Sequence, residues 1–339
     1  MADSIIIRTA VPADRDAIRA LMKASLGEGV IPRTDAFWAW KHENNPFGLS
    51  PVLVAEADGR IVGLRAFMRW TWWTGDRPVS AVRAVDTATH PDWQGRGIFK
   101  RLTLALRDGV KAEGVSLVYN TPNAQSRPGY LKMGWVAVGR PTIWVRPLHP
   151  GRLVASLARG RASGLEGPPP PVDASPASEV LARADVRAWL ERAAVAPDGR
   201  LHTRRDPAYL AWRYAAIPDF EYFALTRGDG DDGALVLLRS RRRGRIGEIR
   251  VCDVMAGPAA SARRNAVALL GEAARSADAD VAIAMPGAMP GVWLARAGYL
   301  PVPNVGPILT VCPLNEAPGS PDPRLPRAWR LSIGDLELF

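Results

Sequence analysis

The sequence of 339 residues predicts an α/β protein built from two similar domains. Three observations support this prediction. Strand-like and helix-like patterns alternate along the first 145 residues. A glycine-containing loop, 94–99, joins an apolar, strand-like run at 79–89 to a helical run at 97–111. Several short motifs of the first half recur in the second half in the same order.

Local patterns define the elements of the first domain. Thr34 is a suitable N-cap for a helix, and Asp58-Gly59 is typical of a hairpin turn. One expected helix carries apolar residues at helical spacing, namely Ile18, Leu21, Met22 and Leu26. In chain order we expect a strand at 5–8, a helix from Pro12, a helix at about 34–44, strands at 51–57, 60–73 and 79–89, a helix at 97–111, a strand at 115–120, a short helix at about 125–133, and strands to about 145.

The loop 94–99 has the features of an anion-binding site. A helix N-terminus presents free backbone N–H groups and the positive end of its dipole. Gly95 and Gly97 allow the backbone to approach a ligand closely, and Arg96, Lys100 and Arg101 add positive charge. The sequence therefore predicts that this loop binds a phosphorylated cofactor.

The loop sequence excludes two common phosphate motifs. It contains neither the P-loop pattern nor the dinucleotide fingerprint with its downstream acidic residue. Gln94-Gly95-Arg96-Gly97-Ile98-Phe99 instead resembles the acetyl-CoA pyrophosphate loop of the GCN5-related N-acetyltransferase (GNAT) family. Phe99 is a departure, because that position is usually Gly or Ala in the family.

A second segment carries the same resemblance. Residues 120–135, from Asn120 to Trp135, are similar to the family's Asn-x-x-Ala…Tyr-x-x-x-Gly-Phe segment. The resemblance implies that the preceding strand separates from its neighbour, so that cofactor amides can bind the exposed edge. It also places the hydroxyl of Tyr130 near the CoA sulfur. A phenol is protonated at neutral pH and can donate to the departing thiolate.

The resemblance implies both a fold and an activity. Each domain would be a mixed, mostly antiparallel twisted sheet flanked by helices. The activity would be direct transfer of acetyl from acetyl-CoA to a primary amine of a small molecule or natural product, with backbone N–H groups near 87–89 polarising the thioester carbonyl. The cofactor-binding residues implied are Thr87, Ala88, Thr89, Gln94, Gly95, Arg96, Gly97, Ile98, Phe99, Lys100 and Asn123.

Asp86 is the first candidate for the general base that deprotonates the amine. It is a carboxylate in an otherwise apolar strand, where its pKa can be tuned by its surroundings. The alternative is a structural role, because Asp253 occupies the same place in the second half and the two carboxylates could bond Arg83 and Arg250 or a neighbouring turn. His90 is a further candidate that would act through water.

Three motif pairs indicate a duplicated domain. They are Trp38-Ala39-Trp40-Lys41 with Leu210-Ala211-Trp212-Arg213, Arg83-Ala84-Val85-Asp86 with Arg250-Val251-Cys252-Asp253, and Met133-Gly134-Trp135 with Ala297-Gly298-Tyr299. The second copy lacks the glycine pair and has Leu294 in place of Tyr130. We therefore expect a catalytic domain at 1–149, a Pro/Gly/Ala-rich linker at 150–178, and a degenerate domain at 179–339.

The acceptor and the donor are less well defined. Tryptophans before the loop could form an aromatic acceptor wall or pack in the core, namely Trp38, Trp40, Trp70, Trp72 and Trp73. The terminal carboxylate of Phe339 could reach the active site, as it does in some tandem relatives. A longer acyl-CoA donor, a hydroxyl acceptor and a non-catalytic acyl-CoA sensor remain alternatives.

Composition limits the other function classes. The apolar runs are shorter than the roughly 20 residues that span a bilayer, and we expect a cytoplasmic protein without a signal peptide. Two cysteines and four scattered histidines predict neither a disulfide framework nor a metal site. The net charge of +10 suits a polyanionic cofactor. The arginine run 239–245 is expected in a hairpin turn, so nucleic acid is not an expected partner. A homodimer is left open.

Overall fold

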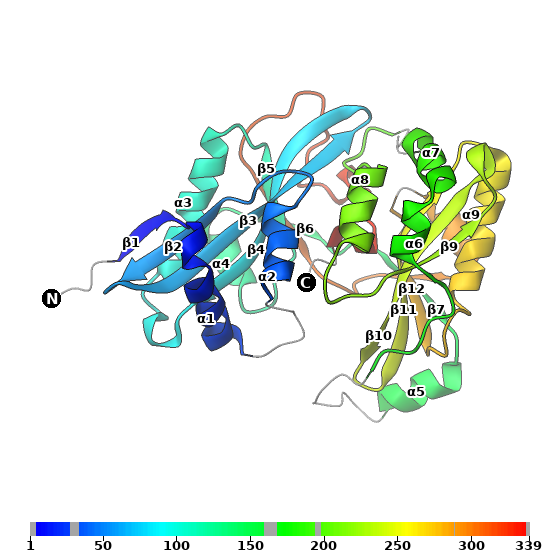
Figure 1. Cartoon of the computed structure of the whole chain (residues 1–339), viewed down its shortest axis with the longest axis horizontal. Helices are drawn as coiled ribbons and strands as arrows, with labels where there is room; N and C mark the ends of the chain where they lie inside the picture. The colour runs from blue at the N-terminus through cyan, green and yellow to red at the C-terminus, as the bar shows by residue number, and fades with distance from the viewer. Residues whose placement is uncertain (1–4, 28–33, 159–167, 194–197, 288, 337–339) are drawn as a thin grey trace. The chain divides into compact units, whose positions relative to one another are not determined.

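The computed structural model describes residues 5–27, 34–158, 168–193, 198–287 and 289–336. The chain divides into two compact units. Figure 1 labels their helices and strands. The first unit combines residues 1–139 with 307–326, and the second combines residues 140–306 with 327–338. Each unit therefore contains segments that are distant in the sequence.

The first unit is a mixed sheet with helices on both faces. Its strand order is β1-β2-β3-β4-β5-β14-β6; β4 and β5 run parallel, and the other neighbours are antiparallel. The elements are β1 (Ile6–Thr9), α1 (Arg15–Leu26), α2 (Asp35–Trp38), a π-helical turn (Ala39–Glu43), β2 (Val52–Ala57), β3 (Arg60–Thr74), β4 (Arg77–Thr89), α3 (Ile98–Ala112), β5 (Leu117–Asn120), α4 (Arg127–Lys132), β6 (Val136–Gly139) and β14 (Leu309–Pro313). The elements expected from the sequence are present, and the helix predicted at 34–44 is a short α-helix that continues as a π-helical turn.

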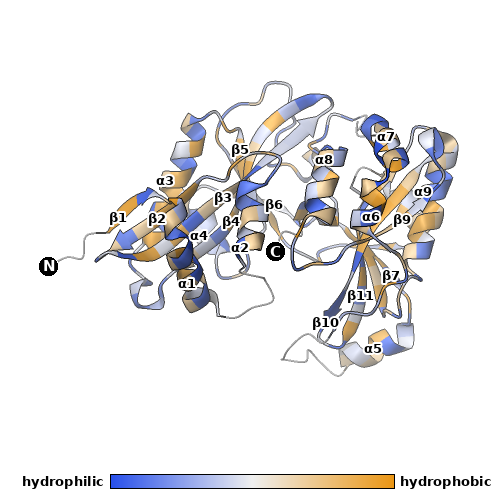
Figure 2. Cartoon of the chain, viewed as in Figure 1, coloured by the Kyte–Doolittle hydropathy of each residue, from blue (hydrophilic) through white to orange (hydrophobic). Residues whose placement is uncertain are grey.

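Two neighbouring residues of β3 face the two layers of helices. Leu64 packs with buried residues of α1. Gly63 faces Ile98 and Leu102 of α3, which approach the strand closely because glycine has no side chain. Adjacent residues of a strand point to opposite faces, so α1 and α3 cover opposite sides of this sheet. Figure 2 shows apolar residues along these strands and on α3.

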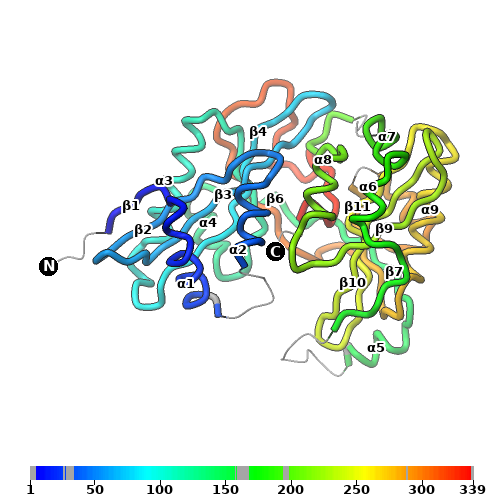
Figure 3. The backbone as a smooth tube through the Cα atoms, viewed as in Figure 1, coloured from blue at the N-terminus to red at the C-terminus, as the bar shows by residue number. Residues whose placement is uncertain are grey.

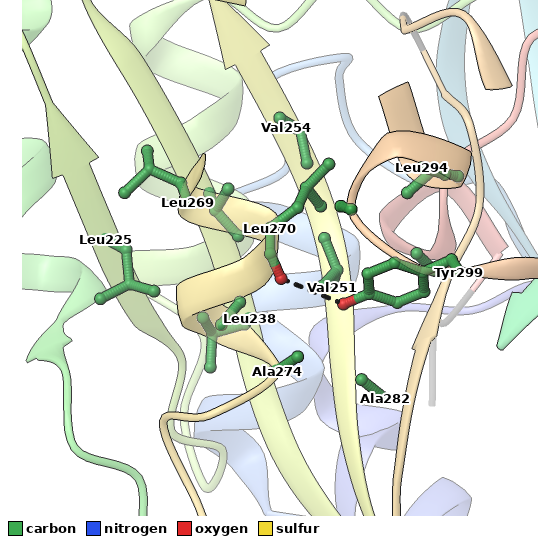
Figure 4. Packing of buried hydrophobic residues seen from close by; sticks show 14 of the residues in the cluster. Leu225, Leu238, Val251, Val254, Leu269, Leu270, Ala274, Ala282, Leu294 and Tyr299 are labelled. Atoms are coloured by element: carbon green, nitrogen blue, oxygen red, sulfur yellow. Dashed lines mark hydrogen bonds between the residues drawn. The ribbon is translucent and has the colours of Figure 1, made fainter. Parts of the chain in front are cut away.

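The second unit repeats this architecture. Its sheet has the order β8-β9-β10-β11-β12-β7-β13. Its elements are β7 (Ile143–Pro147), α5 (Pro150–Ala158), β8 (Ser175–Pro176), α6 (Ala177–Ala182), α7 (Ala184–Ala193), α8 (Pro207–Leu210), a π-helical turn (Ala211–Ala215), β9 (Phe223–Arg227), β10 (Ala234–Arg243), β11 (Ile246–Ala256), α9 (Ala260–Ala273), β12 (Val281–Ala284), α10 (Gly291–Arg296), β13 (Leu300–Val302) and α11 (Ile333–Leu336). Its buried core brings Leu238 of β10 and Val251 of β11 together with Leu270 of α9 and Leu294 of α10 (Figure 4).

The two sheets exchange one strand. At the position next to the last strand, the first sheet has β14 from the C-terminal half, and the second sheet has β7 from the N-terminal half. β7 lies among the strands of the second sheet in Figure 3. Each half therefore supplies a strand to the sheet of the other half.

This exchange places the domain boundaries differently from the sequence prediction. The predicted first domain, 1–149, includes β7, which pairs in the second sheet. The predicted linker, 150–178, contains α5 and β8, although 159–167 lies outside the described residues. A strand pattern shows that a segment is extended and half-buried, but it does not show which sheet the segment joins.

Candidate active site

The loop between β4 and α3 has the conformation expected of an anion site. Gly95 and Gly97 both have a φ of +76°, a left-handed conformation that favours glycine. The first backbone hydrogen bond of α3 runs from the N–H of Arg101 to the carbonyl of Gly97. The N–H groups of residues 98–100 precede that bond and point out of the helix end. The loop from Gln94 to Gly97 is exposed, so these donors are accessible to a ligand.

The polar side chains around this loop differ in how they are held. Arg96 stacks on the Trp93 ring, with 4.4 Å between its guanidinium carbon and the ring centroid. Lys100 is exposed at the helix start. The Gln94 amide donates to the Thr89 carbonyl at 3.4 Å, and Arg101 donates to a backbone carbonyl of the N-terminal strand region at 3.1 Å. Arg96 and Lys100 are thus the cations placed to face an anion at the loop.

His90 acts as a local cap. Its Nδ1 accepts a hydrogen bond from the backbone N–H of Asp92 at 3.3 Å. This bond fixes the 3₁₀ turn Pro91–Trp93 that leads into the loop. The role of a base acting through water stays a prediction.

Beside the loop, β4 continues past the end of its pairing with β5. The parallel pairing runs from Ala81 and Leu117 to Arg83 and Tyr119. Residues 84–89 of β4 extend beyond it, and the strand pairing described for them is with β3. Backbone groups on this edge of β4 are open to a ligand that adds to the sheet.

A β-bulge lies on the same stretch of β4. Arg65 of β3 pairs with Thr87, whereas Phe67 pairs with Ala84. β4 thus has one residue more than β3 between these pairs, and Asp86 lies within the bulge. Bulges redirect side chains and backbone N–H groups and are common beside active sites.

Asp86 is held by two residues that the sequence analysis did not select. Its carboxylate lies 2.9 Å from Lys41 Nζ and 2.8 Å from His42 Nε2. Burial opposes ionisation, but the Lys41 charge and the His42 hydrogen bond outweigh it and hold the pKa of Asp86 below its usual range. Arg83 donates to Thr121 Oγ1 at 3.3 Å. The structural alternative for Asp86 stays a prediction.

The surroundings of His42 favour its neutral imidazole form. Its burial lowers its pKa below the ordinary value, and the Asp86 carboxylate offsets this only in part. A carboxylate only accepts hydrogen bonds, so Nε2 carries the hydrogen that points to Asp86. Nδ1 is left with its lone pair and has no hydrogen-bond partner within the described part of the chain.

Two cavities meet at His42. A small one of about 30 Å³ is lined by α1, α2 and the site residues Lys41, His42 and Asp86. A larger one of about 390 Å³ is lined by residues 9–12, His42, Ser50 and Arg69. The half-buried Trp38 lines both cavities, whereas Trp40, Trp70 and Trp72 are buried in the core. The smaller volume is sufficient for a water molecule.

Tyr130 lies on α4 and is buried, with 3% of its surface exposed. Its hydroxyl accepts a hydrogen bond from Arg65 Nη2 at 2.5 Å. The ring of Phe99, from the first turn of α3, meets the Tyr130 ring edge-on at 5.6 Å between centroids. Phe99 thus connects the anion-binding loop to the candidate acid, and Arg65 is a further residue that the sequence analysis missed.

The other predicted cofactor residues have mainly structural contacts. The Asn123 side-chain oxygen accepts from the backbone N–H groups of Gln125 and Ser126, and so positions α4. Thr87 Oγ1 donates to the Leu64 carbonyl at 3.3 Å. Ala88 is buried against α1, and the Thr89 carbonyl accepts from Ser25 Oγ. Ile98 is buried over Gly63. Their contribution to cofactor binding stays a prediction.

The corresponding place in the second unit has different chemistry. Asp253 of β11 pairs with Arg205 at 2.5 Å and accepts a hydrogen bond from Tyr214, which stands where His42 stands in the first unit. Arg205 also pairs with Asp335 of α11. Asp335 of α11 thus completes a buried network around Asp253, in the position that corresponds to Asp86. Phe339, whose carboxylate was considered as a catalytic group, lies outside the described residues.

The described part of the chain contains neither a candidate metal site nor a helix that could span a membrane. No cluster of three or more His, Cys, Asp or Glu side chains with metal-binding geometry occurs among them. No helix in the same ranges has the length and apolar character needed to cross a bilayer.

Comparisons with known proteins give a family match for part of the chain and several structures of similar fold. Residues 6–138 match the acetyltransferase (GNAT) domain family. The chain is similar in structure to a GCN5-related N-acetyltransferase from Anabaena variabilis, with 13% identity, a TM-score of 0.64, and coverage of 92% of this chain and 73% of that chain. A probable N-acyltransferase from Enterococcus faecalis has 11% identity, a TM-score of 0.61 and the same coverage. Eis1 from Mycobacterium abscessus has 15% identity, a TM-score of 0.55, and coverage of 92% and 74%. No curated protein sequence matches the chain.

Proposed function

Residues 6–138 form an acetyltransferase domain of the GNAT family within a tandem chain, and from this premise we propose that the protein transfers acetyl from acetyl-CoA directly to a primary amine of a small molecule or natural product. One observation carries the proposal. The strand β4 bears both the bulge at Asp86 and, at its end, the glycine loop that presents helix N–H groups. The 30 Å³ cavity lined by Asp86 and the anion-binding loop thus lie along the same strand.

The donor would bind along β4. The N–H groups of residues 98–100, with Arg96 and Lys100, suit the pyrophosphate of CoA. The unpaired edge at 84–89 suits the amides of the pantetheine arm. Backbone N–H groups of the same edge would polarise the thioester carbonyl, and Tyr130 would protonate the departing sulfur.

The proton of the amine would leave through His42 and Asp86. Asp86 is ionised and ion-paired with Lys41, which lowers its affinity for a proton. His42 is neutral and keeps a lone pair on Nδ1. In this proposal His42 Nδ1 accepts the proton, directly or through a water in the 30 Å³ cavity, while Asp86 holds the ring and stabilises its charge. The predicted base, Asp86, would then act through His42.

The second unit would serve as a degenerate partner. It lacks the glycine pair, and Leu294 stands in place of Tyr130. We propose one acetyl-CoA for each chain, bound in the first unit.

The test is a screen of primary amines with acetyl-CoA, with the free thiol as readout. We expect thiol release to depend on both substrates. Tyr130→Phe should lower kcat by about 10²- to 10⁴-fold and leave the Kd for CoA nearly unchanged. Tyr299→Phe is the matched control, because this buried tyrosine of the second unit donates to the Leu270 carbonyl (Figure 4). CoA binding without turnover of any amine would favour a sensor, and faster turnover with longer acyl-CoAs or with alcohols would revise the donor or the acceptor.

A further inference from the structure

Arg65 is a fully buried cation at the centre of the candidate site. Its side chain is 0% exposed. Its guanidinium lies 4.9 Å from the ring centroid of Phe67, 5.4 Å from Tyr130 and 5.8 Å from Phe99. Nη2 donates to the Tyr130 hydroxyl. Among the described residues, Nε and Nη1 have no hydrogen-bond partner.

This arrangement is costly for folding. A buried charge is usually paired with an opposite charge and fully hydrogen-bonded. Within the described ranges, the Arg65 guanidinium makes a hydrogen bond with one hydroxyl and cation–π contacts with three aromatic rings. Cation–π contacts recover only part of the desolvation free energy. The fold by itself would be better served by an apolar side chain.

The second unit shows that the fold does not need this arginine. Val236 occupies the equivalent position, because it pairs with Val254 just before the β11 bulge as Arg65 pairs with Thr87. Val236 is fully buried in the apolar core. The same strand arrangement therefore forms with valine at this position.

The partner of Arg65 is replaced as well. The N–H of Trp135 bonds the carbonyl of Tyr130 after α4, and the N–H of Tyr299 bonds the carbonyl of Leu294 after α10. Leu294 thus stands in the place of Tyr130, and Figure 4 shows it within the apolar cluster. At these two positions the first unit has arginine and tyrosine together, and the second unit has neither.

We propose that Arg65 is a positioning residue for acetyl transfer, which acts through Tyr130. This proposal rests on the proposed function. The Arg65 hydrogen bond occupies a lone pair of the Tyr130 oxygen and leaves the hydroxyl hydrogen free for the departing sulfur. When the amine nitrogen has bonded to the acetyl carbon, the C–S bond breaks and its electron pair goes to sulfur. The Tyr130 proton then passes to sulfur to form the thiol, and the guanidinium stabilises the phenolate. After CoA leaves, the Tyr130 oxygen regains a proton from solvent, which balances the proton that the amine released to solvent through His42.

Phe99 acquires a role in the same arrangement. Its ring closes one side of the space around Arg65, where a small residue would leave it open. Gly129 makes room for it, since a methyl group added there would lie 3.2 Å from the Phe99 ring. The departure from the family pattern at Phe99 thus fits a protein that keeps water away from a buried arginine. Low local dielectric strengthens the effect of the charge on the Tyr130 oxygen.

The experiment compares Arg65→Met, Arg65→Lys and Tyr130→Phe with the double variant of Arg65→Met and Tyr130→Phe. We expect Arg65→Met to lower kcat by about 10- to 100-fold, with KM for acetyl-CoA and Kd for CoA within about threefold of wild type. Arg65→Lys should recover part of kcat. In the Tyr130→Phe background, Arg65→Met should have almost no further effect, because both residues act on one proton transfer.

Arg239→Met is the control for the loss of a buried arginine, since Arg239 lies in the second sheet over the Phe220 ring. Thermal unfolding of each variant shows whether the variant folds, so a loss of turnover can be assigned to chemistry. If Arg65→Met does not fold, Arg65→Lys and Phe99→Leu replace it, each alone and in combination with Tyr130→Phe. Equal turnover of Arg65→Met and wild type, or independent effects of Arg65 and Tyr130, would overturn the proposal. Wild-type protein that releases no thiol with any amine would overturn the proposed function, and this proposal with it.

Discussion

Asp86 and Asp253 occupy equivalent strand positions, and their neighbours give them different chemistry. Asp86 holds a neutral histidine whose second nitrogen has a free lone pair among the described residues. Asp253 is enclosed by Arg205 and Tyr214, and burial raises the pKa of Tyr214 well above its usual range. The neutral His42 beside Asp86 can accept a proton at neutral pH, whereas the hydrogen bonds of Asp253 with Arg205 and Tyr214 form a structural network.

The first residue-scale prediction concerns His42. His42→Gln keeps a donor for Asp86 but removes the basic nitrogen, so we expect kcat/KM to fall about 10²-fold or more. Steady-state kinetics with acetyl-CoA and the best amine is the measurement. Tyr214→Phe, the equivalent change in the second unit, should alter turnover little. Full activity of His42→Gln would remove this residue from the mechanism.

The second residue-scale prediction concerns stability in mild acid. The pKa of His42 is lower in the folded protein than its ordinary value of about 6.5, so the unfolded chain binds the proton more tightly. The free energy of unfolding should therefore fall as the pH drops below about 6.5. His202 in the second unit shifts in the same direction.

Thermal unfolding midpoints at pH 7.5 and 5.5 test this expectation. The wild-type unfolding midpoint should be lower at pH 5.5 than at pH 7.5. The decrease should be smaller in His42→Gln, because one histidine with a lowered pKa has been removed. An equal fall in both proteins would show that His42 does not contribute.

At the scale of elements, the position of α3 on β3 decides where the anion loop lies. Gly63 lets the first turns of α3 approach the sheet: a methyl group there would lie 2.5 Å from Ile98 Cγ2 and 3.0 Å from Leu102 Cδ1. Ile98 directly follows the N-cap Gly97. The packing of the helix and the geometry of the phosphate cradle are therefore linked.

Gly63→Ala should destabilise the protein by about 1–3 kcal/mol, because α3 must move outward. We also expect weaker CoA binding, since the loop moves with the helix. Chemical denaturation and calorimetry with CoA are the measurements.

Gly109→Ala is the matched control. Gly109 lies on the exposed side of α3, with no atom within 4 Å of an added methyl group. It should stabilise the helix by about 0.5–1 kcal/mol and leave CoA binding unchanged. Equal effects of the two substitutions would contradict the role given to Gly63.

At the scale of the whole molecule, the strand exchange makes each sheet depend on both halves of the chain. β14 lies between β5 and β6, and β7 lies between β12 and β13. Within the described residues, β6 pairs with β14 alone, and β13 pairs with β7 alone. Removal of one exchanged strand thus also leaves a second strand unpaired.

A fragment that ends at Gly139 should consequently fail to fold cooperatively, because it lacks β14. A fragment with residues 307–326 joined after residue 139 through a flexible linker should regain a cooperative transition. Circular dichroism melting and CoA binding distinguish the two. Cooperative unfolding of the shorter fragment would show that the exchanged strand is dispensable.

Much of the fold was predictable because it depends on local chemistry. The apolar periodicity of α1, the Asp58-Gly59 turn and the glycine pair at the anion loop each determine a local conformation. The motif repeats identified the duplication, since the two sheets have the same strand order. For the site, the motifs selected the loop, Tyr130 and Asp86.

The remaining site residues depend on contacts between distant parts of the chain. Arg65 meets Tyr130 across 65 residues of sequence, and Asp86 meets His42 across 44. The repeat of Trp40-Lys41 as Trp212-Arg213 marks the turn that carries His42, but a repeat does not show which way a side chain points. A lone buried arginine has no sequence signature, because its burial is a property of the packed sheet.

The sequence by itself determined the duplicated α/β architecture, the glycine loop and its anion-binding character, because backbone conformation at glycine and side-chain periodicity are local properties. Only the tertiary structure decided which sheet β7 and β14 join, which partners hold Asp86, and that Phe99 encloses Arg65. These features depend on which surfaces meet, and that is set by the packing of segments far apart in the chain.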